Sequence, residues 1–145
     1  MYCTGGGGSD TCCCLPSPDA ILPSTIINLA LSNASSNSID LAWTAPGDDG
    51  NIGTATTYDI RYSTAPITEA NWASATQAVG EPAPSVAGSA ESMTVSGLNS
   101  STTYYFAIKT SDEVLNISSI SNVPSLATTF APTPHTIFYE TFPNA

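Results

Sequence analysis

Two short acidic segments carry the oxygen-bearing side chains that bind hard divalent cations. The first, Gly-Asp-Asp-Gly-Asn, contains Asp48, Asp49 and Asn51, and the second, Ser-Asp-Glu-Val, contains Asp112 and Glu113. Calcium prefers carboxylate and carbonyl oxygens, so these residues predict a calcium site if the fold brings the two segments together. The alternative is a pair of solvated acidic turns, in which Asp and Asn are favoured by backbone geometry.

The cysteines form a second group of reactive residues, and all of them lie near the start of the chain, at Cys3, Cys12, Cys13 and Cys14. Four cysteines allow three pairings, and each one here joins adjacent residues or closes a very short loop. Adjacent α-carbons are about 3.8 Å apart, below the usual disulfide range, so local pairing is strained. Cross-links to another chain and one local disulfide with free thiols both remain open. A zinc site is a weaker interpretation, because the C-x-x-C spacing is missing and no histidine is near.

No arrangement typical of an active site is present in the sequence. His135 is the only histidine, and its surroundings suggest neither a partner nor a pocket for general base chemistry. Motifs for a hydrolase nucleophile, a zinc protease or a phosphate-binding loop are absent. Asp48 and Asp49 are adjacent and diverge, whereas glycoside hydrolysis needs carboxylates that flank a bond. We therefore expect a chain that is not an enzyme and has no cofactor apart from the calcium considered above.

Alternating β-strands are the elements that must position the acidic segments. Apolar side chains recur at every second residue in three stretches, at Ile39, Leu41 and Trp43, at Tyr58, Ile60 and Tyr62, and at Tyr104, Phe106 and Ile108. A period of two predicts half-buried strands of an antiparallel sheet. We expect strands at residues 25–31, 38–44, 56–63, 74–79, 89–95, 102–110 and 121–128. A helical turn at residues 68–75 is also predicted, with Thr68 as its cap and Trp72 packed down.

These strands resemble the fibronectin type III pattern. Trp43 lies near the end of the second strand, Tyr-x-Ile-x-Tyr forms the third, and L-x-x-x-T-x-Y-x-F-x-I runs from Leu98 to Ile108. The resemblance covers about residues 23–129 and implies an all-β fold, a seven-stranded antiparallel Ig-like β-sandwich. It implies that Trp43 is the core tryptophan and that the Tyr104 hydroxyl caps nearby backbone as a tyrosine corner. It also implies that the two acidic segments emerge at the same pole of the sandwich.

The chain is expected to divide into three parts: a Cys/Gly-rich extended tail at residues 1–22, the sandwich at 23–130, and a linker with an extra strand at 131–145. The final stretch, HTIFYETF, is apolar on both faces through Ile137, Phe138, Tyr139 and Phe142. A strand of this kind invites association in water. It either adds to a sheet edge of a neighbouring copy or opens a further domain of a longer chain.

The charge balance limits the class of partner. Two basic residues stand against twelve acidic ones, for a formal net charge of −10. Nucleic acid and anionic membrane surfaces require clusters of Lys and Arg, so neither is an expected partner. No apolar run is long enough for insertion into a membrane. N-x-S/T sequons begin at Asn33, Asn99 and Asn116, and with the Ser/Thr-rich composition they indicate a glycosylated chain outside the cell or at its surface.

Two functions are consistent with these features. The first is an extracellular structural protein whose copies are joined through terminal strands, as in a filament or a surface polymer. The second is a spacer or carbohydrate-associated accessory module of a secreted multidomain enzyme. A calcium-dependent adhesion domain is a third hypothesis. The expected partners are therefore other copies, adjacent domains of a longer chain, or carbohydrate, and the family resemblance alone does not choose among them.

Overall fold

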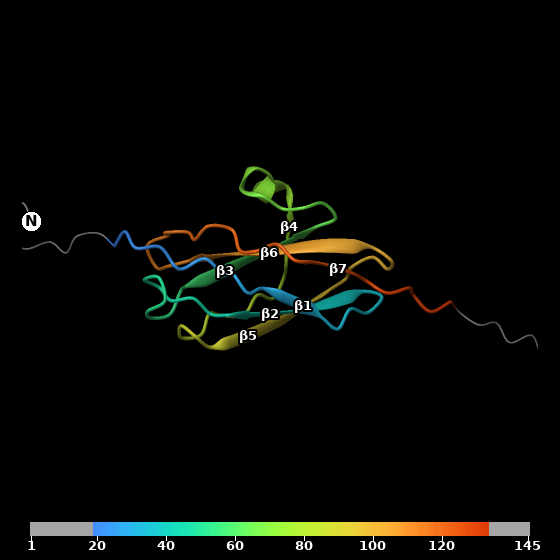
Figure 1. Cartoon of the computed structure of the whole chain (residues 1–145), viewed down its shortest axis with the longest axis horizontal. Helices are drawn as coiled ribbons and strands as arrows, with labels where there is room; N and C mark the ends of the chain where they lie inside the picture. The colour runs from blue at the N-terminus through green and yellow to red at the C-terminus, as the bar shows by residue number, and fades with distance from the viewer. Residues whose placement is uncertain (1–18, 134–145) are drawn as a thin grey trace, which may run out of the picture.

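Two antiparallel β-sheets pack face to face in the computed structural model, which describes residues 19–133 (Figure 1). One sheet has the order β1-β2-β5, with β1 at Ala30–Ser32, β2 at Ser38–Thr44 and β5 at Ala90–Ser96. The other has the order β4-β3-β6-β7, with β4 at Thr76–Gln77, β3 at Thr57–Ser63, β6 at Thr103–Ser111 and β7 at Ser125–Ala127. The predicted seven-stranded antiparallel sandwich is confirmed.

The core between the sheets consists of the alternating apolar residues of β2, β3 and β6. Phe106, Ile39 and Ile60 are fully buried there. Trp43 is 3% exposed, and its ring meets that of Tyr58 edge-on, with centroids 5.3 Å apart. Burying one such side chain stabilises the fold by about 2 kcal/mol. The prediction that Trp43 is the core tryptophan is confirmed.

Tyr104 closes the sandwich beside the turn between β5 and β6. Its ring is buried, and its hydroxyl accepts a hydrogen bond from the backbone N–H of Asn99 at 3.1 Å. This is the contact expected of a tyrosine corner, in which a core tyrosine ties down the backbone upstream of its own strand. The prediction for Tyr104 is confirmed.

The first and last strands are shorter than predicted, because side chains replace part of the backbone ladder. The Asn122 side chain accepts from the N–H of Leu29 at 2.9 Å and donates to its carbonyl at 2.8 Å, so regular pairing begins only at Ala30. The hydroxyls of Ser118 and Ser121 accept from backbone N–H groups of β6, at 3.0 and 2.9 Å. Residues 118–121 therefore follow β6 without forming a regular strand, and β7 begins at Ser125.

The fourth strand is also truncated, to the two residues of β4. Beyond it, a side chain again replaces a strand, because Oε1 of Glu81 accepts from the backbone N–H of Ile60 at 2.5 Å. This substitution satisfies the outer edge of β3, which would otherwise expose unpaired backbone groups.

A 3₁₀ helix, η1 (Glu69–Ser74), lies on the outer side of the four-stranded sheet (Figure 1). It is the predicted helical turn, and Thr68 is its N-cap, with the Thr68 N–H donating to Oδ1 of Asn71 at 2.7 Å. Trp72 packs from η1 toward the sheet, and Ala107 of β6 is fully buried in the apolar cluster between η1 and the sheet. The central strand β6 is therefore covered on both faces. Within residues 19–133, no helix is long and apolar enough to cross a bilayer.

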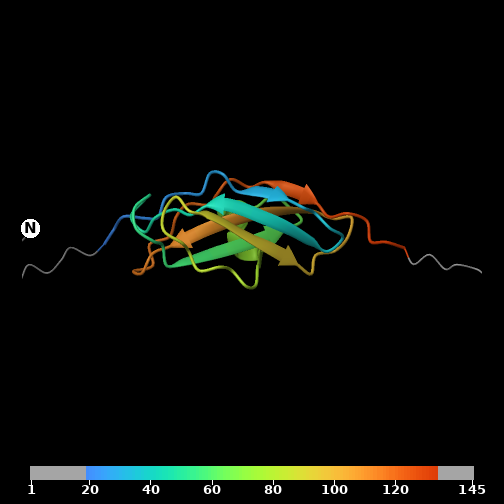
Figure 2. The same ribbon diagram turned by 90° about the horizontal axis from the view of Figure 1, so that it is seen from below.

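The chain enters the sandwich at one pole and leaves at the opposite pole (Figures 1 and 2). We call the first end the N-terminal pole, formed by residues 19–24 and by the loops at 45–56 and 112–117. We call the other end the C-terminal pole, formed by the turns at 33–37 and 97–102 and by residues 128–133. Backbone hydrogen bonds fix both, from Ser24 N–H to the Gly50 carbonyl at 3.0 Å and from Thr129 N–H to the Ser35 carbonyl at 2.8 Å.

Candidate functional site

The N-terminal pole gathers five carboxylates from three separate segments. Asp19 comes from the incoming chain, Asp48 and Asp49 from the loop after β2, and Asp112 and Glu113 from the loop after β6. Carboxylate oxygens of Asp19, Asp112 and Glu113 all lie within 4.8 Å of one another. The two acidic segments singled out in the sequence therefore do meet, and Asp19 joins them.

The loop after β2 holds Asp48 and Asp49 in a tight turn with several backbone hydrogen bonds. The N–H groups of Gly47 and Asp48 donate to the carbonyls of Gly50 and Ile52, both at 2.8 Å. A Cβ at Gly47 would collide with the backbone of Ile52, so only glycine permits the loop to close. The N–H of Gly50 also donates to the Leu22 carbonyl at 3.1 Å, which ties the incoming chain to this loop. This hydrogen bond explains why Asp19 lies close to the carboxylates of the two loops.

The loop after β6 is organised around Asp112, which is fully buried. Its Oδ1 accepts from the N–H groups of Val114 and Asn116, at 3.0 and 2.8 Å. Its Oδ2 accepts from Nδ2 of Asn116 at 2.7 Å. The neighbouring Glu113 is exposed and its carboxylate approaches those of Asp19 and Asp112. Asp112 thus shapes the loop and also presents oxygen to the cluster.

Asp48 and Asp49 are the two carboxylates of this group whose negative charge receives the least compensation from neighbouring donors or cations. Oδ1 of each is buried and has no hydrogen-bond donor among the described residues. Loss of hydration raises the pKa of Asp48 above its ordinary value, and the charge of Glu113, a side-chain hydrogen bond with it, and the charges of Asp112 and Asp49 raise it further. Burial likewise raises the pKa of Asp49, with added repulsion from Asp19, Glu113 and Asp112 and a side-chain hydrogen bond with Asp19. The strongest charges that act on these two groups are all negative.

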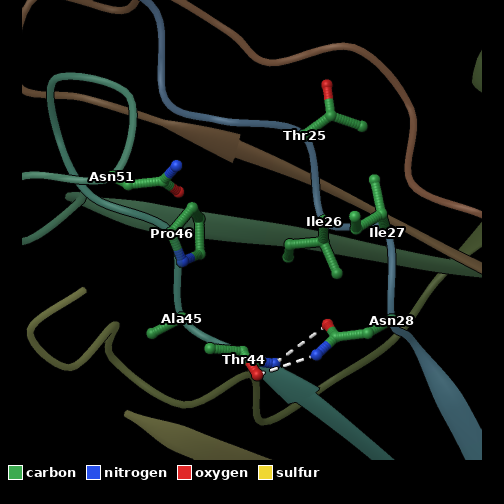
Figure 3. A pocket seen from close by; sticks show the side chains of 8 residues that line it. All are labelled: Thr25, Ile26, Ile27, Asn28, Thr44, Ala45, Pro46 and Asn51. Atoms are coloured by element: carbon green, nitrogen blue, oxygen red, sulfur yellow. Dashed lines mark hydrogen bonds between the residues drawn. The ribbon is translucent and has the colours of Figure 1, made fainter. Parts of the chain in front are cut away.

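Asn51, which the sequence analysis grouped with the calcium ligands, lines a different cavity. This cavity of about 210 Å³ lies between the incoming chain at residues 25–28 and the end of β2 (Figure 3). On one side of the cavity, Asn28 forms two hydrogen bonds with Thr44. Asn28 Nδ2 donates to Thr44 Oγ1 at 2.8 Å, and the Thr44 N–H donates to Asn28 Oδ1 at 3.2 Å. The side chain of Asn51 is exposed at the rim. It does not act on the pKa of Asp48 or Asp49.

The chain's two basic residues both lie over the ring of Trp72, on the outer face of the four-stranded sheet. The Arg61 guanidinium is 5.2 Å and Lys109 Nζ is 4.8 Å from the ring centroid. Arg61 also pairs with Asp59 at 2.9 Å, and Lys109 pairs with Glu69. Both cations are therefore already engaged by a carboxylate and an aromatic ring, and neither acts on Asp48 or Asp49.

The three sequons differ in how their amide nitrogens are used. Nδ2 of Asn116 donates to Asp112 and, at 3.3 Å, to the carbonyl of Asp19, so a glycan there would remove two contacts of the N-terminal pole. Nδ2 of Asn33 donates to Oδ2 of Asp40 at 3.0 Å. Asn99 is exposed in the turn between β5 and β6, and within residues 19–133 no hydrogen bond engages its side-chain amide. Of the three, Asn99 is the site that glycosylation would disturb least.

Several predicted site residues lie outside the described residues. They are the cysteines and the proposed assembly strand with its neighbouring histidine, namely Cys3, Cys12, Cys13, Cys14, His135, Ile137, Phe138, Tyr139 and Phe142. The expected tails lie largely in the same segments. These interpretations remain predictions.

Asp19 is the residue that sequence reasoning missed. It was assigned to the tail, because residues 1–22 lack any strand pattern. The available signal was its position, since Asp19 lies four residues before Pro23, where the sandwich was expected to begin. A carboxylate this close to the first core residues has to lie beside one of the two poles.

Comparison with known proteins identifies the fold and a set of relatives. Chitinase A1 of Niallia circulans is 33% identical over 113 residues, which cover 78% of this chain and 13% of the chitinase. Chitinase Chi52 of Paenibacillus xylanexedens is 32% identical over 127 residues, which cover 88% of this chain and 20% of the chitinase. The chain thus spans a fifth or less of these relatives.

A solved structure of similar fold is the fibronectin type III domain derived from the human KIAA0970 protein. It matches with a TM-score of 0.54 at 14% identity, over 84% of this chain and 86% of that one, which shows the fold alone. The profile of the fibronectin type III domain matches residues 23–122. Because that match covers most of the chain, this protein belongs to the fibronectin type III family.

Proposed function

We propose that this chain is a non-catalytic module that spaces other domains in a secreted, polysaccharide-degrading protein. The support comes from its similarity to two chitinases, of which it spans 13% and 20%. A region of that size within a much longer enzyme is an accessory part. The accessory-module hypothesis therefore has more support than the filament hypothesis.

The observation that carries the proposal is the placement of the chain ends. The polypeptide enters the sandwich at the N-terminal pole and leaves at the C-terminal pole (Figures 1 and 2). A module with this geometry adds its long axis to the distance between whatever precedes and follows it. Domains with adjacent termini add no such distance.

A spacer must also hold its ends firmly, and backbone hydrogen bonds do so here. Gly50 contacts the incoming chain on both sides, at Leu22 and Ser24, with bonds of 3.1 and 3.0 Å. At the other pole, Thr129 accepts from the N–H of Ser101 at 3.1 Å and donates to Ser35 at 2.8 Å. Residues 22–24 and Thr129 are thus tied to the sandwich by backbone hydrogen bonds.

Carbohydrate binding has weaker support than spacing. Sugar rings stack on flat, open aromatic faces, and Trp72 is the aromatic residue best placed on the outer sheet. Its ring is half-buried and lies under both Arg61 and Lys109. Stacking a sugar on the face that these cations occupy would displace favourable cation–π contacts. We therefore assign the module to spacing, with an extracellular location suggested by its relatives and by the exposed sequon at Asn99.

A linker exchange tests this proposal. The full chain is placed between a chitinase catalytic domain and a chitin-binding domain, and compared with a Gly/Ser linker of the same length, which behaves as a flexible coil. We expect the sandwich to change the rate on insoluble chitin, where the span between domains matters, and to leave the rate on soluble oligosaccharides unchanged. Equal rates on insoluble chitin, or chitin hydrolysis by the chain alone, would contradict the proposal.

The filament hypothesis depends on residues 135–142, outside the described range. Deleting residues 135–145 is expected to leave the sandwich folded, because the seven strands lie between Ala30 and Ala127. If the chain forms polymers, the deletion should abolish them. If the variant that lacks residues 135–145 still forms polymers in electron micrographs, the terminal strand is not the contact that joins the copies.

A further inference from the structure

We infer that the five carboxylates of the N-terminal pole bind one calcium ion, which fixes the incoming chain to the sandwich. The site consists of Asp19, Asp48, Asp49, Asp112 and Glu113, and we call it the acidic pole site. This inference does not depend on the spacer proposal, because it concerns the ion that the pole binds and not the protein to which the module belongs.

The distances between the oxygens fit a single ion. Calcium binds oxygens at about 2.3–2.6 Å, so two of its ligands on opposite sides are about 5 Å apart. Oxygens of Asp19, Asp112 and Glu113 lie within 4.8 Å of one another, inside that limit. One ion therefore reaches all three carboxylates without movement of the backbone.

A second, independent observation is the pair of unsatisfied oxygens on Asp48 and Asp49. Oδ1 of each is buried without a hydrogen-bond donor among the described residues. Buried polar atoms in folded proteins nearly always have a partner, and a carboxylate oxygen is costly to leave without one. The backbone bonds of Asp48 to Ile52 and of Gly47 to Gly50 keep the two residues in this turn despite that cost. A cation would supply the partner that these two oxygens have not found among the described residues.

The part of the chain that the structure describes supplies no such cation. Its two basic residues, Arg61 and Lys109, are held against Trp72 with the carboxylates of Asp59 and Glu69. The strongest charges that act on Asp48 and Asp49 come from other acidic groups. Within residues 19–133, no Lys or Arg side chain is therefore left to pair with them, and we assign the partner to solution.

The donor set selects calcium over other metals. All five ligands are carboxylates, with no sulfur or imidazole among them, which favours a hard cation over zinc or copper. They come from three segments with no regular spacing, and calcium tolerates irregular sets of six to eight oxygens. Magnesium demands near-ideal octahedral geometry at shorter distances and retains its water, so it fits less well.

Binding would join three segments that are otherwise linked by backbone hydrogen bonds and by the Asn116 side chain. Asp19 belongs to the incoming chain, which contacts the loops through Leu22, Ser24 and the Asn116 side chain. An ion shared with the loops at 47–51 and 112–116 would hold residues 19–22 against the pole. The direction of the chain before the sandwich would then depend on calcium.

Isothermal titration calorimetry of the full chain tests the inference. Protein treated with chelator and dialysed into 150 mM NaCl is titrated with CaCl₂ and separately with MgCl₂. We expect one calcium per chain with a Kd of about 10⁻⁵ to 10⁻³ M, and weaker binding of magnesium. Asp48→Asn and Glu113→Gln are each expected to weaken calcium binding by about 10- to 100-fold. Asp112 is not used as a test, because its three hydrogen bonds also shape the loop.

Asp40→Asn is the matched control. It removes the same unit of charge from β2, where Asp40 accepts from Thr94 and Asn33, outside the acidic pole site. Its calcium affinity should equal that of the unchanged protein. Absence of saturable heat would overturn the inference. So would equal affinities for Asp48→Asn and Asp40→Asn, because binding would then follow net charge alone.

Discussion

The two poles of this sandwich differ in how the polar groups of their loops are satisfied. At the C-terminal pole, neutral groups satisfy one another: Thr128 Oγ1 donates to the Asn99 carbonyl at 2.6 Å and accepts from Thr102 N–H at 3.0 Å, and the Tyr104 hydroxyl accepts from Asn99 N–H. At the N-terminal pole, carboxylates face other carboxylates, and two of their oxygens have no donor within residues 19–133. One pole is satisfied within the described residues, whereas the other leaves carboxylate oxygens without a donor there, which is where we propose that calcium binds.

The largest expected effect is the response of the N-terminal pole to calcium. An ion that binds only the folded state at a hundredfold excess over its Kd stabilises that state by about 2.7 kcal/mol. We expect calcium to raise the melting temperature of the full chain and a chelator to reverse the rise. The measurement is differential scanning calorimetry with CaCl₂ and then with EDTA. A melting temperature that changes with neither CaCl₂ nor EDTA would contradict the proposed difference between the poles.

The second prediction concerns the C-terminal pole alone. Tyr104→Phe removes the oxygen that accepts from Asn99 and leaves that N–H unpaired. We expect a loss of about 0.5–1.5 kcal/mol in the free energy of unfolding, the usual net contribution of one hydrogen bond, because Asn99 is exposed and water can replace part of the contact. The loss should be the same with and without calcium, because Tyr104 lies at the opposite pole. Denaturant unfolding in both conditions checks this, and a calcium-dependent loss would show that the poles are coupled.

The third prediction is a change of sign at Asp49. Without calcium, Asp49→Asn removes one of several like charges that repel each other, so the melting temperature should rise. With saturating calcium, the same change removes a ligand charge, and the melting temperature should fall below that of the unchanged protein. Thermal unfolding in the two buffers gives both values. The same sign in both buffers would indicate that Asp49 is not a ligand.

The smallest effect is expected on the outer sheet face, where a carboxylate does have a partner in the chain. A hydrogen bond from Lys109, together with the N–H of Ile120, lowers the pKa of Glu69 below its ordinary value. Its contribution to stability is present above the ordinary pKa and is lost as the pH falls through the lowered folded value. Glu69→Gln should cost less than about 1 kcal/mol at pH 7, because exposed ion pairs contribute little.

The measurement is the unfolding free energy of both proteins from pH 7 down to pH 3. Their difference should shrink as the pH falls, because protonated Glu69 no longer pairs with Lys109. A difference that is constant with pH would assign the effect to side-chain packing.

Much of the sandwich could be predicted because its signal is local. Within β2, Ile39, Leu41 and Trp43 repeat with a period of two, and all three are buried between the sheets. The ends of the strands could not be predicted. Asn122, Ser118 and Ser121 replace backbone partners with side-chain atoms, and such an exchange leaves no trace in a hydrophobic pattern.

The acidic pole site was predictable in part for a similar reason. Asp48, Asp49, Asp112 and Glu113 lie in two loops that the family resemblance places at the same pole. Asp19 could not be found in this way, because its position depends on the hydrogen bonds that tie the incoming chain to Gly50. Asn51 was grouped with the loop carboxylates by sequence proximity; in the structure it lines a separate cavity, and its role as a ligand stays a prediction.

Titration of the ¹⁵N-labelled full chain with CaCl₂, followed by nuclear magnetic resonance of its backbone amides, tests the difference between the poles most directly. Amides of residues 47–53 and 112–116 should shift and then saturate, while those of Asn99, Thr102 and Thr128 should remain in place. A spectrum that does not change, or shifts spread equally over both poles, would contradict the account.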